Sequence, residues 1–369
     1  MGGLCAKSHL YPDEWLSMFF LTLIFLLVCI FELEYERKQK GISANTQTTF
    51  IRLSVTYTVS GGLIYAISYL PEFYRPVMIP VILLTAVSNS MVAVSFGLFF
   101  DLVLALTVGG SFYALAAYMM LTMLAAVLAQ ALKEKKYRMG VSLLTFFFSL
   151  MIPELFSYLS TKEMQKYSLL YAFGTAFLTF LTAAFLFHRL LHEADQEIEN
   201  HLLDIVSEDY SEVKALKDFS MVEYRHAVKV SDIACRCAKE VGYRANLCLA
   251  GGFYYRMGRW IGEPYIKNAV NKAESLCFPA ELISILAEYY GEEQRPSSPE
   301  SALVHMVDAV VIRLEAMEQN VGQSVWNRDI VIYQTVNDFS SSEIYDHSGM
   351  SMNQFLKIRE FLAKEELLR

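Results

Sequence analysis

The chain has 369 residues, of which 54% are hydrophobic and only 19% are charged, and this composition excludes an ordinary soluble protein. Residues 1–190 carry a net charge of +3 and residues 191–369 a net charge of −11. The sequence therefore predicts a membrane half followed by an acidic, water-soluble half. Because an acidic domain repels phosphate backbones, we do not expect nucleic acid as a partner.

Long apolar segments in the first half predict helices that cross a bilayer. Four segments are each predicted to form a single span: residues 15–31, 53–70, 140–159 and 168–187. Between them, residues 77–131 contain one charged residue, Asp101, and are broken by Ser88-Asn89-Ser90 and by Gly109-Gly110-Ser111. Three short spans, or two spans plus a re-entrant piece, both fit this region.

The positive charges favour the first of these alternatives. Lys and Arg gather on the cytoplasmic side of membrane proteins, so an even number of spans should separate the basic clusters at residues 37–40 and 133–138. Residues 77–131 must then supply three spans. We expect about seven spans, an external N-terminus and a cytoplasmic C-terminal domain.

Two acidic residues, Asp101 and Glu154, fall inside apolar segments. Carboxyl groups are costly in hydrocarbon, so both should face the bundle interior and meet Ser, Thr or Tyr hydroxyls. One interpretation is a role in transport or signal sensing; the other is that the carboxyls help the spans to pack.

The second half has helical periodicity throughout. We predict a membrane domain over residues 1–190, an amphipathic helical connector over 191–218 and an all-α domain over 219–369. Expected helices carry Val230, Ile233, Ala234, Cys237 and Val241 on one stripe; Leu282, Ile285, Leu286 and Tyr289 on another; and Phe355, Leu356 and Leu362 after Ser351. A further helix should begin at Ser297-Ser298-Pro299-Glu300.

Four motifs follow one another in this domain. They are YRHA at 224–227, GGFYYRMGR at 251–259, EYYG at 288–291 and PESALVHMVDAVV at 299–311. Their order resembles the HD phosphohydrolase domain of the seven-transmembrane HD family, which includes bacterial membrane cyclic di-AMP phosphodiesterases. The resemblance covers roughly residues 75–369, but the family's large extracytoplasmic domain has no counterpart between the first two spans.

The resemblance implies a site for two metal ions, Fe or Mn, whose ligands this chain has largely lost. His226 and Asp308 match the family's first and last ligands. Tyr255 and Arg256 stand where the His-Asp pair should be, and Tyr289 and Tyr290 stand where further histidines should be. Tyr is a poor ligand at neutral pH, and a guanidinium repels cations. We therefore expect no bound metal and no catalytic residue.

Two questions stay open about the residues at these positions: what Arg256 binds, and whether another metal site replaces the lost one. Arg256 could replace the metals as the counter-charge of Asp308, or it could point to solvent while Asp308 bonds locally. His226, His305 and Asp308 could instead form a two-histidine, one-carboxylate iron site, which would restore an enzyme.

The resemblance thus implies a protein of a bacterial cell membrane with a non-hydrolytic HD-like module in cyclic-dinucleotide-type signalling. One class is a nucleotide pocket, in which phosphate or base contacts come from Arg256, Arg259, His226, His305, Tyr254, Tyr255, Tyr289 and Tyr290. The tyrosines could equally be core residues. A second class is a protein-interaction module, with a protein partner or a homodimer. The alternative is an active membrane phosphodiesterase that hydrolyses cyclic di-AMP.

Overall fold

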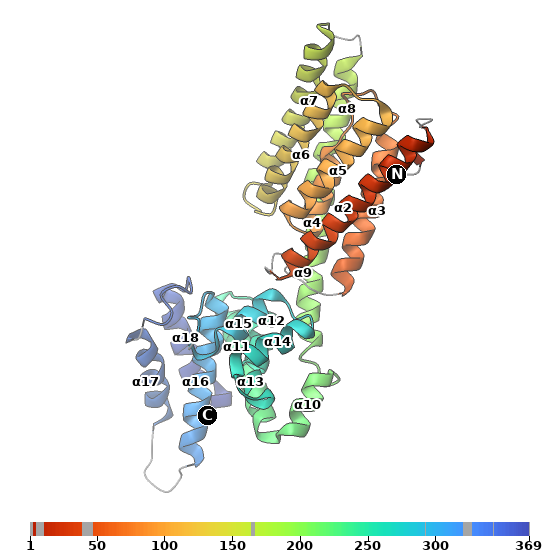
Figure 1. Ribbon diagram of the computed structural model, residues 1–369. Helices are drawn as coiled ribbons and strands as arrows, with labels where there is room; N and C mark the ends of the chain where they lie inside the picture. The colour runs from red at the N-terminus through yellow and green to blue at the C-terminus, as the bar shows by residue number, and fades with distance from the viewer. Residues whose placement is uncertain are drawn as a thin grey trace. The chain divides into compact units, whose positions relative to one another are not determined.

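A computed structural model describes residues 3–4, 11–38, 47–163, 167–291, 293–319, 327–341 and 343–368. Within these ranges the chain is helical, with no β-strand, so the predicted all-α fold class is confirmed. The chain divides into two compact units, Met1–Asp195 and Gln196–Arg369. Figure 1 shows the helices of both units.

The N-terminal unit is a bundle of apolar helices. In chain order they are α2 (Pro12–Lys38), α3 (Gln47–Ile67), α4 (Met78–Val87), α5 (Ser90–Val108), α6 (Phe112–Leu132), α7 (Arg138–Thr161) and α8 (Ser168–Leu181). A π-helical segment, η1 (Thr182–Leu186), joins α8 to α9 (Phe187–Asp204). The last predicted span therefore continues directly into α9, and the division between the units falls inside this helix.

The two interruptions predicted within residues 77–131 are both confirmed. Asn89 caps α5, because its side chain accepts a hydrogen bond from Val92 N at 2.9 Å. Gly109 ends that helix in the left-handed conformation, with φ of 71°. Ser111 then caps α6 by accepting from Ala114 N at 3.2 Å. Local capping chemistry thus divides this apolar region into α4, α5 and α6.

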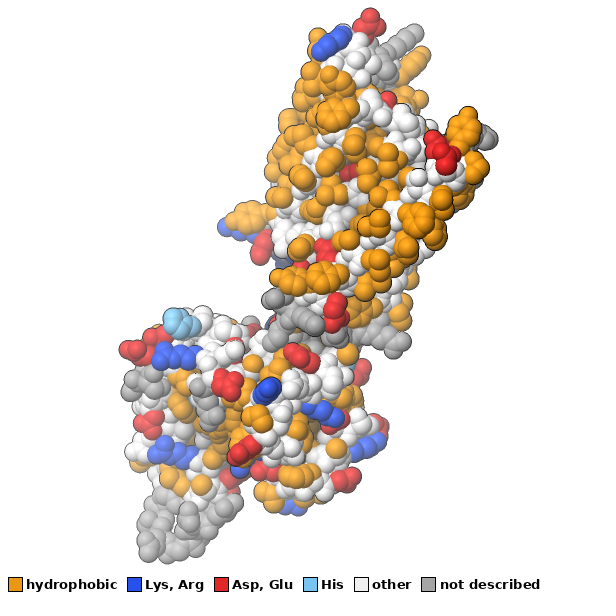
Figure 2. Space-filling view, in the orientation of Figure 1, with side chains coloured by type: hydrophobic (Ala, Val, Ile, Leu, Met, Phe, Trp, Pro, Cys, Tyr) orange, Lys and Arg blue, Asp and Glu red, His pale blue; other side chains and the backbone are white. Residues whose placement is uncertain are grey.

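The predicted count of seven membrane spans is confirmed only in part. Among the described residues, six helices are long and apolar enough to cross a bilayer. The remaining apolar helix, α4, has 10 residues, all of them buried. At about 1.5 Å per residue it covers roughly half of a hydrocarbon core about 30 Å thick. A seventh span is therefore not confirmed. The apolar side chains that cover much of this unit's face in Figure 2 are nevertheless those expected of a membrane protein.

The acidic residues of the bundle behave differently from each other. Asp101 is buried and accepts a hydrogen bond from the Thr122 hydroxyl at 2.7 Å, as predicted. Glu154 is only partly buried, and its Oε1 has no hydrogen-bond partner among the described residues. The predicted hydroxyl partner is therefore confirmed by a hydrogen bond for Asp101, and for Glu154 the hydroxyl within interaction range is that of Tyr74.

The C-terminal unit is built from shorter helices. They are α10 (Ser211–Phe219), α11 (Met221–Val241), α12 (Ala245–Tyr254), α13 (Met257–Ile261), α14 (Tyr265–Ser275), α15 (Ala280–Ala287), α16 (Pro299–Gln319), α17 (Arg328–Ser341) and α18 (Met352–Lys364). Helices α11, α12 and α16 pack against one another. The apolar stripes predicted for α11 and α15 are buried at Val230, Ile233, Leu282 and Leu286, so these two helices supply part of the core.

A close helix approach sets the position of α12 against α11. A methyl group on Gly252 would lie 2.9 Å from Ser231 Cα and 3.0 Å from Ser231 N, so only glycine fits there without a backbone shift. The Ser231 hydroxyl also donates to Leu249 O at 2.7 Å. This contact brings the residues that follow α12, Tyr255 and Arg256, close to the start of α11.

Two other sequence predictions concern the last helices. Helix α16 begins at Pro299 with the Ser298 hydroxyl accepting from Ser301 N at 3.1 Å, as expected. Ser351 forms a capping box with Gln354 at the start of α18. Phe355 and Leu362 are buried, but the inward position predicted for Leu356 is wrong, because Leu356 is exposed and Ile358 is buried instead. Residues 355, 358 and 362 follow the helical period, whereas 356 lies about 100° away from 355.

Candidate functional site

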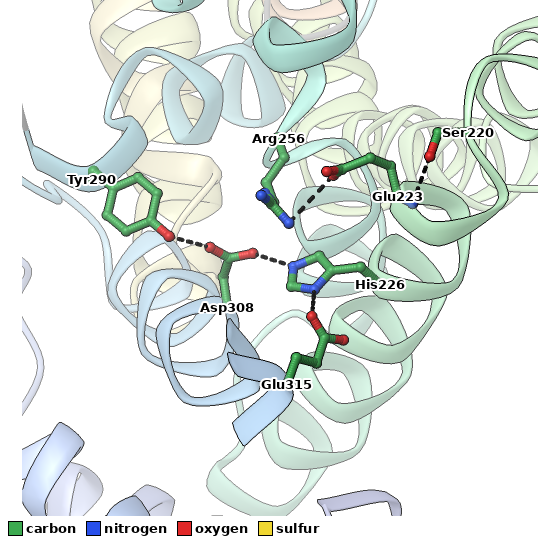
Figure 3. A network of polar contacts seen from close by, with 7 residues as sticks. All are labelled: Ser220, Glu223, His226, Arg256, Tyr290, Asp308 and Glu315. Atoms are coloured by element: carbon green, nitrogen blue, oxygen red, sulfur yellow. Dashed lines mark hydrogen bonds and ion pairs between the residues drawn. The ribbon is translucent and has the colours of Figure 1, made fainter. Parts of the chain in front are cut away.

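A buried ion pair between α11 and α16 forms the centre of the candidate site. His226 Nε2 lies 2.8 Å from Asp308 Oδ1, and the two side chains are 4% and 1% exposed. Figure 3 shows the imidazole and the carboxylate facing each other. The two residues that match the HD motif are therefore brought together, but they contact each other directly.

A second carboxylate holds the other side of the imidazole. His226 Nδ1 lies 2.8 Å from Glu315 Oε2. Burial lowers the pKa of His226, but the hydrogen bonds to Asp308 and Glu315 and the charges of these two carboxylates outweigh burial and raise it to about 9. At neutral pH the ring is therefore an imidazolium that donates from both nitrogens.

Tyr290 completes the surroundings of Asp308. Its hydroxyl donates to Asp308 Oδ2 at 2.9 Å, on the opposite side of the carboxylate from His226. The backbone of Tyr290 is left-handed, with φ of 54°, a conformation that costs a non-glycine residue about 1–3 kcal/mol. Its amide donates to the Tyr255 hydroxyl at 3.0 Å. The strained turn thus directs the phenol onto the carboxylate.

Arg256 binds a different carboxylate from the one predicted. Its Nη1 lies 3.3 Å from Glu223 Oε2, and its side chain is 12% exposed. No ion pair joins Arg256 to Asp308 in the part of the chain that is described. Both sequence alternatives for this arginine are therefore wrong: it does not pair with Asp308, and it does not point to solvent. Figure 3 shows it reaching toward Glu223, beside the His226–Asp308 pair.

Most of the tyrosines considered for a nucleotide pocket are core residues. Tyr254 and Tyr255 are fully buried, and Tyr289 is buried as well. The Tyr254 hydroxyl donates to Ile205 O at 2.5 Å. Burial raises the pKa of Tyr255 well above its ordinary value, so it stays a neutral phenol. Because stacking on a base requires an exposed ring face, these side chains do not form a base platform.

The two other residues considered for ligand binding, Arg259 and His305, have different surroundings. Arg259 is exposed on α13. His305 is buried, and its Nδ1 lies 2.9 Å from the Tyr345 hydroxyl. Burial lowers the pKa of His305 to about 4, so the ring is neutral. Phe339, Tyr290 and Tyr345 surround it with ring centroids 4.9, 5.5 and 5.7 Å away.

The residues present do not fit a dinuclear metal centre or a single iron site. Both ring nitrogens of His226 are hydrogen-bonded to carboxylates, Nε2 to Asp308 and Nδ1 to Glu315. The Nδ1 atom of His305 contacts Tyr345, and Tyr255 is a neutral phenol. Among the described residues, no group of three or more His, Cys, Asp or Glu side chains is arranged to hold a metal ion.

Three contributors to the site escaped sequence reasoning: Glu223, Glu315 and Tyr345. Helical spacing contained a signal for two of them. Glu223 lies three residues before His226 on α11, and Glu315 lies seven residues after Asp308 on α16, so each shares a helix face with a motif residue. No such periodicity points to Tyr345, which lies between α17 and α18.

Comparison with known proteins gives distant similarities. No protein-family model matches the chain. A ribonuclease Y from Finegoldia magna is 29% identical over 106 residues, which are 26% of this chain and 20% of that protein's length. The chain thus spans about a fifth of this relative, and the activity of the whole relative is not transferred by the match.

Two similar solved structures are those of the HD domain of L. monocytogenes phosphodiesterase PgpH. One is 14% identical with a TM-score of 0.37 and covers 42% of this chain and 96% of that domain. The other, in complex with cyclic-di-AMP, is 15% identical with a TM-score of 0.36 and covers 41% and 92%. At these values neither structure determines the fold or the ligand of this chain.

Proposed function

We propose that the chain is a membrane protein whose C-terminal unit is an HD-like domain that no longer hydrolyses phosphodiesters and acts as a regulatory, protein-interaction module in cyclic-dinucleotide-type signalling. The order of the four sequence motifs supports the HD relationship. The observation that carries the loss of hydrolysis is that His226 is bonded through both ring nitrogens to carboxylates, Asp308 and Glu315.

The charges of the side chains at the site also support the loss of hydrolysis. A phosphodiesterase of this kind needs cations to neutralise phosphate and to produce hydroxide. The site instead contains three acidic side chains, Glu223, Asp308 and Glu315, and two basic ones, His226 and Arg256, and each base is paired with an acid. No unpaired positive group is left among these five side chains to attract a phosphodiester.

Tyrosine side chains fill the interior of the site, and this favours a protein-interaction module over a nucleotide pocket. The rings of Tyr254, Tyr255 and Tyr289 are buried, and the Tyr290 hydroxyl is used by Asp308. A cyclic dinucleotide would have to displace these contacts and leave Asp308 buried without a donor, which is costly. We therefore place the regulatory role on the outer surface of the unit.

The test uses the purified full chain in detergent. Cyclic di-AMP is incubated with the protein in the presence of Mn²⁺ or Fe²⁺, with an active HD phosphodiesterase as positive control. Metal content is measured by elemental analysis, and nucleotide binding is measured by calorimetry. We expect no turnover, less than stoichiometric Mn and Fe, and no saturable heat from the nucleotide.

Each contrary result has a distinct meaning. Turnover with bound Mn or Fe would restore the active phosphodiesterase and overturn the proposal. Saturable nucleotide binding without turnover would retain the loss of hydrolysis but replace protein interaction by nucleotide sensing. A variant in which Arg256 is changed to Asp tests whether this arginine alone blocks the metals; we expect it to remain metal-free, because His226 is still held by Asp308 and Glu315.

A further inference from the structure

The corner between α10 and α11 exposes three large apolar side chains that are close together in the chain. Phe219 ends α10, and Met221 and Val222 begin α11; their exposed fractions are 60%, 44% and 70%. Single exposed apolar residues are normal on a protein surface, whereas neighbouring ones mark an interaction surface. We call Phe219, Met221 and Val222 the corner patch.

A well-defined turn holds the corner patch in place. Ser220, the single residue between the two helices, has an extended backbone, and its hydroxyl accepts a hydrogen bond from Glu223 N at 3.3 Å. Its amide donates to Leu216 O at 2.9 Å, and Val213 and Leu216 are the buried residues of α10. The exposure of the patch is therefore a property of the folded unit. A preorganised surface of this kind loses little conformational entropy when it binds.

One acid and one base flank the corner patch in the chain. Asp218 precedes Phe219, and Arg225 follows Met221 by four residues, so it lies on the same face of α11. Both side chains are exposed, and neither forms an ion pair with a described residue. The charged neighbours are engaged elsewhere, in the ion pairs Lys214–Asp209 and Arg256–Glu223 and in the contact of Lys217 with the Tyr224 ring.

These charges decide which kind of partner the surface fits. A strongly acidic protein or an anionic membrane would require an excess of available basic groups. The surface instead offers one acid on α10 and one base on α11, with the apolar side chains between them in the chain. Such a surface is complementary to a second copy of itself related by a two-fold axis, because each acid then meets the base of the other copy.

We propose that the corner patch joins two copies of this chain in a symmetric dimer, in which the two patches meet and Asp218 pairs with the partner's Arg225. The inference rests on the proposed function, since it names a second copy as the partner of the regulatory module. Glu223, in the same turn of α11, binds Arg256, so the dimer contact borders the candidate site (Figure 3).

The size of the patch indicates a weak contact. A stable dimer buries about 800 Å² on each partner, which is more than three side chains supply. Two copies in one membrane are confined to a thin layer, and this raises their effective concentration. The dimer should therefore form in a bilayer.

The experiment measures energy transfer between donor- and acceptor-labelled full chains in vesicles of a neutral phospholipid, as the protein-to-lipid ratio is varied. We expect a saturable signal from a dimer. Val222→Asp, which places a charge in the apolar centre, should raise the ratio at half-maximum by about tenfold or more. Ile330→Asp, at a 54% exposed position on α17, is the matched control and should leave this ratio unchanged.

Exchange of the two charges tests their pairing. Asp218→Arg alone and Arg225→Asp alone should each weaken the dimer by about fivefold, because like charges then face each other. The double variant restores opposite charges and should dimerise like the unmodified chain. The proposal is overturned if the unmodified chain gives no saturable signal, if Val222→Asp dimerises equally well, or if the double variant is no better than either single one.

A cysteine at the patch provides a second readout. Val222→Cys should form an intermolecular disulfide in vesicles under mild oxidation, whereas Ile330→Cys should not. If no disulfide forms and anionic phospholipid alone protects Val222→Cys from a water-soluble maleimide, the patch docks on lipid and the dimer is overturned.

An assay of cyclic di-AMP turnover on the same samples separates this inference from the proposed function. A monomeric chain without turnover overturns the dimer alone. A dimeric chain with turnover overturns the loss of hydrolysis and retains the dimer.

Discussion

His226 and Asp308 form a hydrogen-bonded pair, 2.8 Å between Nε2 and Oδ1, in which both side chains are almost completely buried. The two groups stabilise each other. The carboxylates of Asp308 and Glu315 raise the pKa of the His226 imidazole. The imidazolium in turn keeps Asp308 from being an unpaired charge in the core. The pair thus links α11 to α16 through the two residues that match the HD motif.

The first prediction concerns removal of one member of the pair. His226→Ala should lower the free energy of unfolding of the C-terminal unit by about 3–5 kcal/mol, because it leaves Asp308 buried without its charged partner. Hydrogen exchange of α11 and α16 in the full chain measures this change. His347→Ala, at an exposed position, should alter exchange by less than about 0.5 kcal/mol.

A double substitution separates the pair from the cavity that His226→Ala creates. If the pair is the cause, Asp308→Asn should cost less in the His226→Ala background than in the unmodified protein, which a double-mutant cycle measures as a coupling energy. Additive effects of the two substitutions would contradict the ion-pair account.

The second prediction follows from the pKa of His226, which is about 9 in the folded protein against 6.5 for the free side chain. A raised pKa stabilises the fold fully at pH values below 6.5, and this contribution is lost as the pH rises through 9. The free energy of unfolding of the C-terminal unit should therefore fall by about 3 kcal/mol between pH 6 and pH 10. Hydrogen exchange, corrected for the intrinsic rate at each pH, measures the decline. His226→Phe should remove most of this slope; an unchanged slope in the variant would assign it to other groups.

Sequence alone was sufficient where the determinants are local. The caps at Asn89, Ser111 and Ser351 and the left-handed Gly109 are short-range features, so the interruptions of the apolar region and the start of α18 could be located in advance. Motif order was also sufficient to bring His226 and Asp308 together. It did not reveal that α4 has only 10 residues, because the lengths of the helices within this apolar region depend on where each one is capped.

The partners of charged residues could not be predicted in the same way. Arg256 was expected either to form an ion pair with Asp308 or to point to solvent, yet it forms an ion pair with Glu223. An arginine side chain is long and flexible, and several carboxylates lie near the same site, so its partner is decided by how α11 and α12 pack. Gly252 controls that packing, and its importance appears only in the distance to Ser231.

The third prediction tests the phenol that contacts Asp308. Tyr290→Phe keeps the ring but removes the hydroxyl that donates to Oδ2 at 2.9 Å. The unit should lose about 1–3 kcal/mol of stability, because a hydrogen bond to a charged, buried acceptor is worth this much. Tyr333→Phe is the matched control: its ring contacts the Arg359 guanidinium through its face, and that contact persists in phenylalanine. Equal effects of the two substitutions would show that the Tyr290 hydroxyl contributes nothing to Asp308.

The last prediction concerns the glycine between α11 and α12. Gly252→Ala places a methyl group 2.9 Å from Ser231 Cα, which the backbone cannot accommodate without moving one helix, so we expect a loss of about 1–3 kcal/mol. The neighbouring Gly251→Ala meets flexible side-chain atoms, Ile285 Cδ1 at 3.2 Å and Val304 Cγ2 at 3.3 Å, and should cost less.

The Gly252→Ala substitution should also affect the ion pair between Arg256 and Glu223, because Arg256 follows α12. In the Gly252→Ala variant this ion pair should be weaker, so Glu223→Gln should have a smaller effect there than in the unmodified protein. Hydrogen exchange of α11 and α12 measures both effects, and a Gly252→Ala variant as stable as the Gly251→Ala variant would contradict the close approach of the two helices.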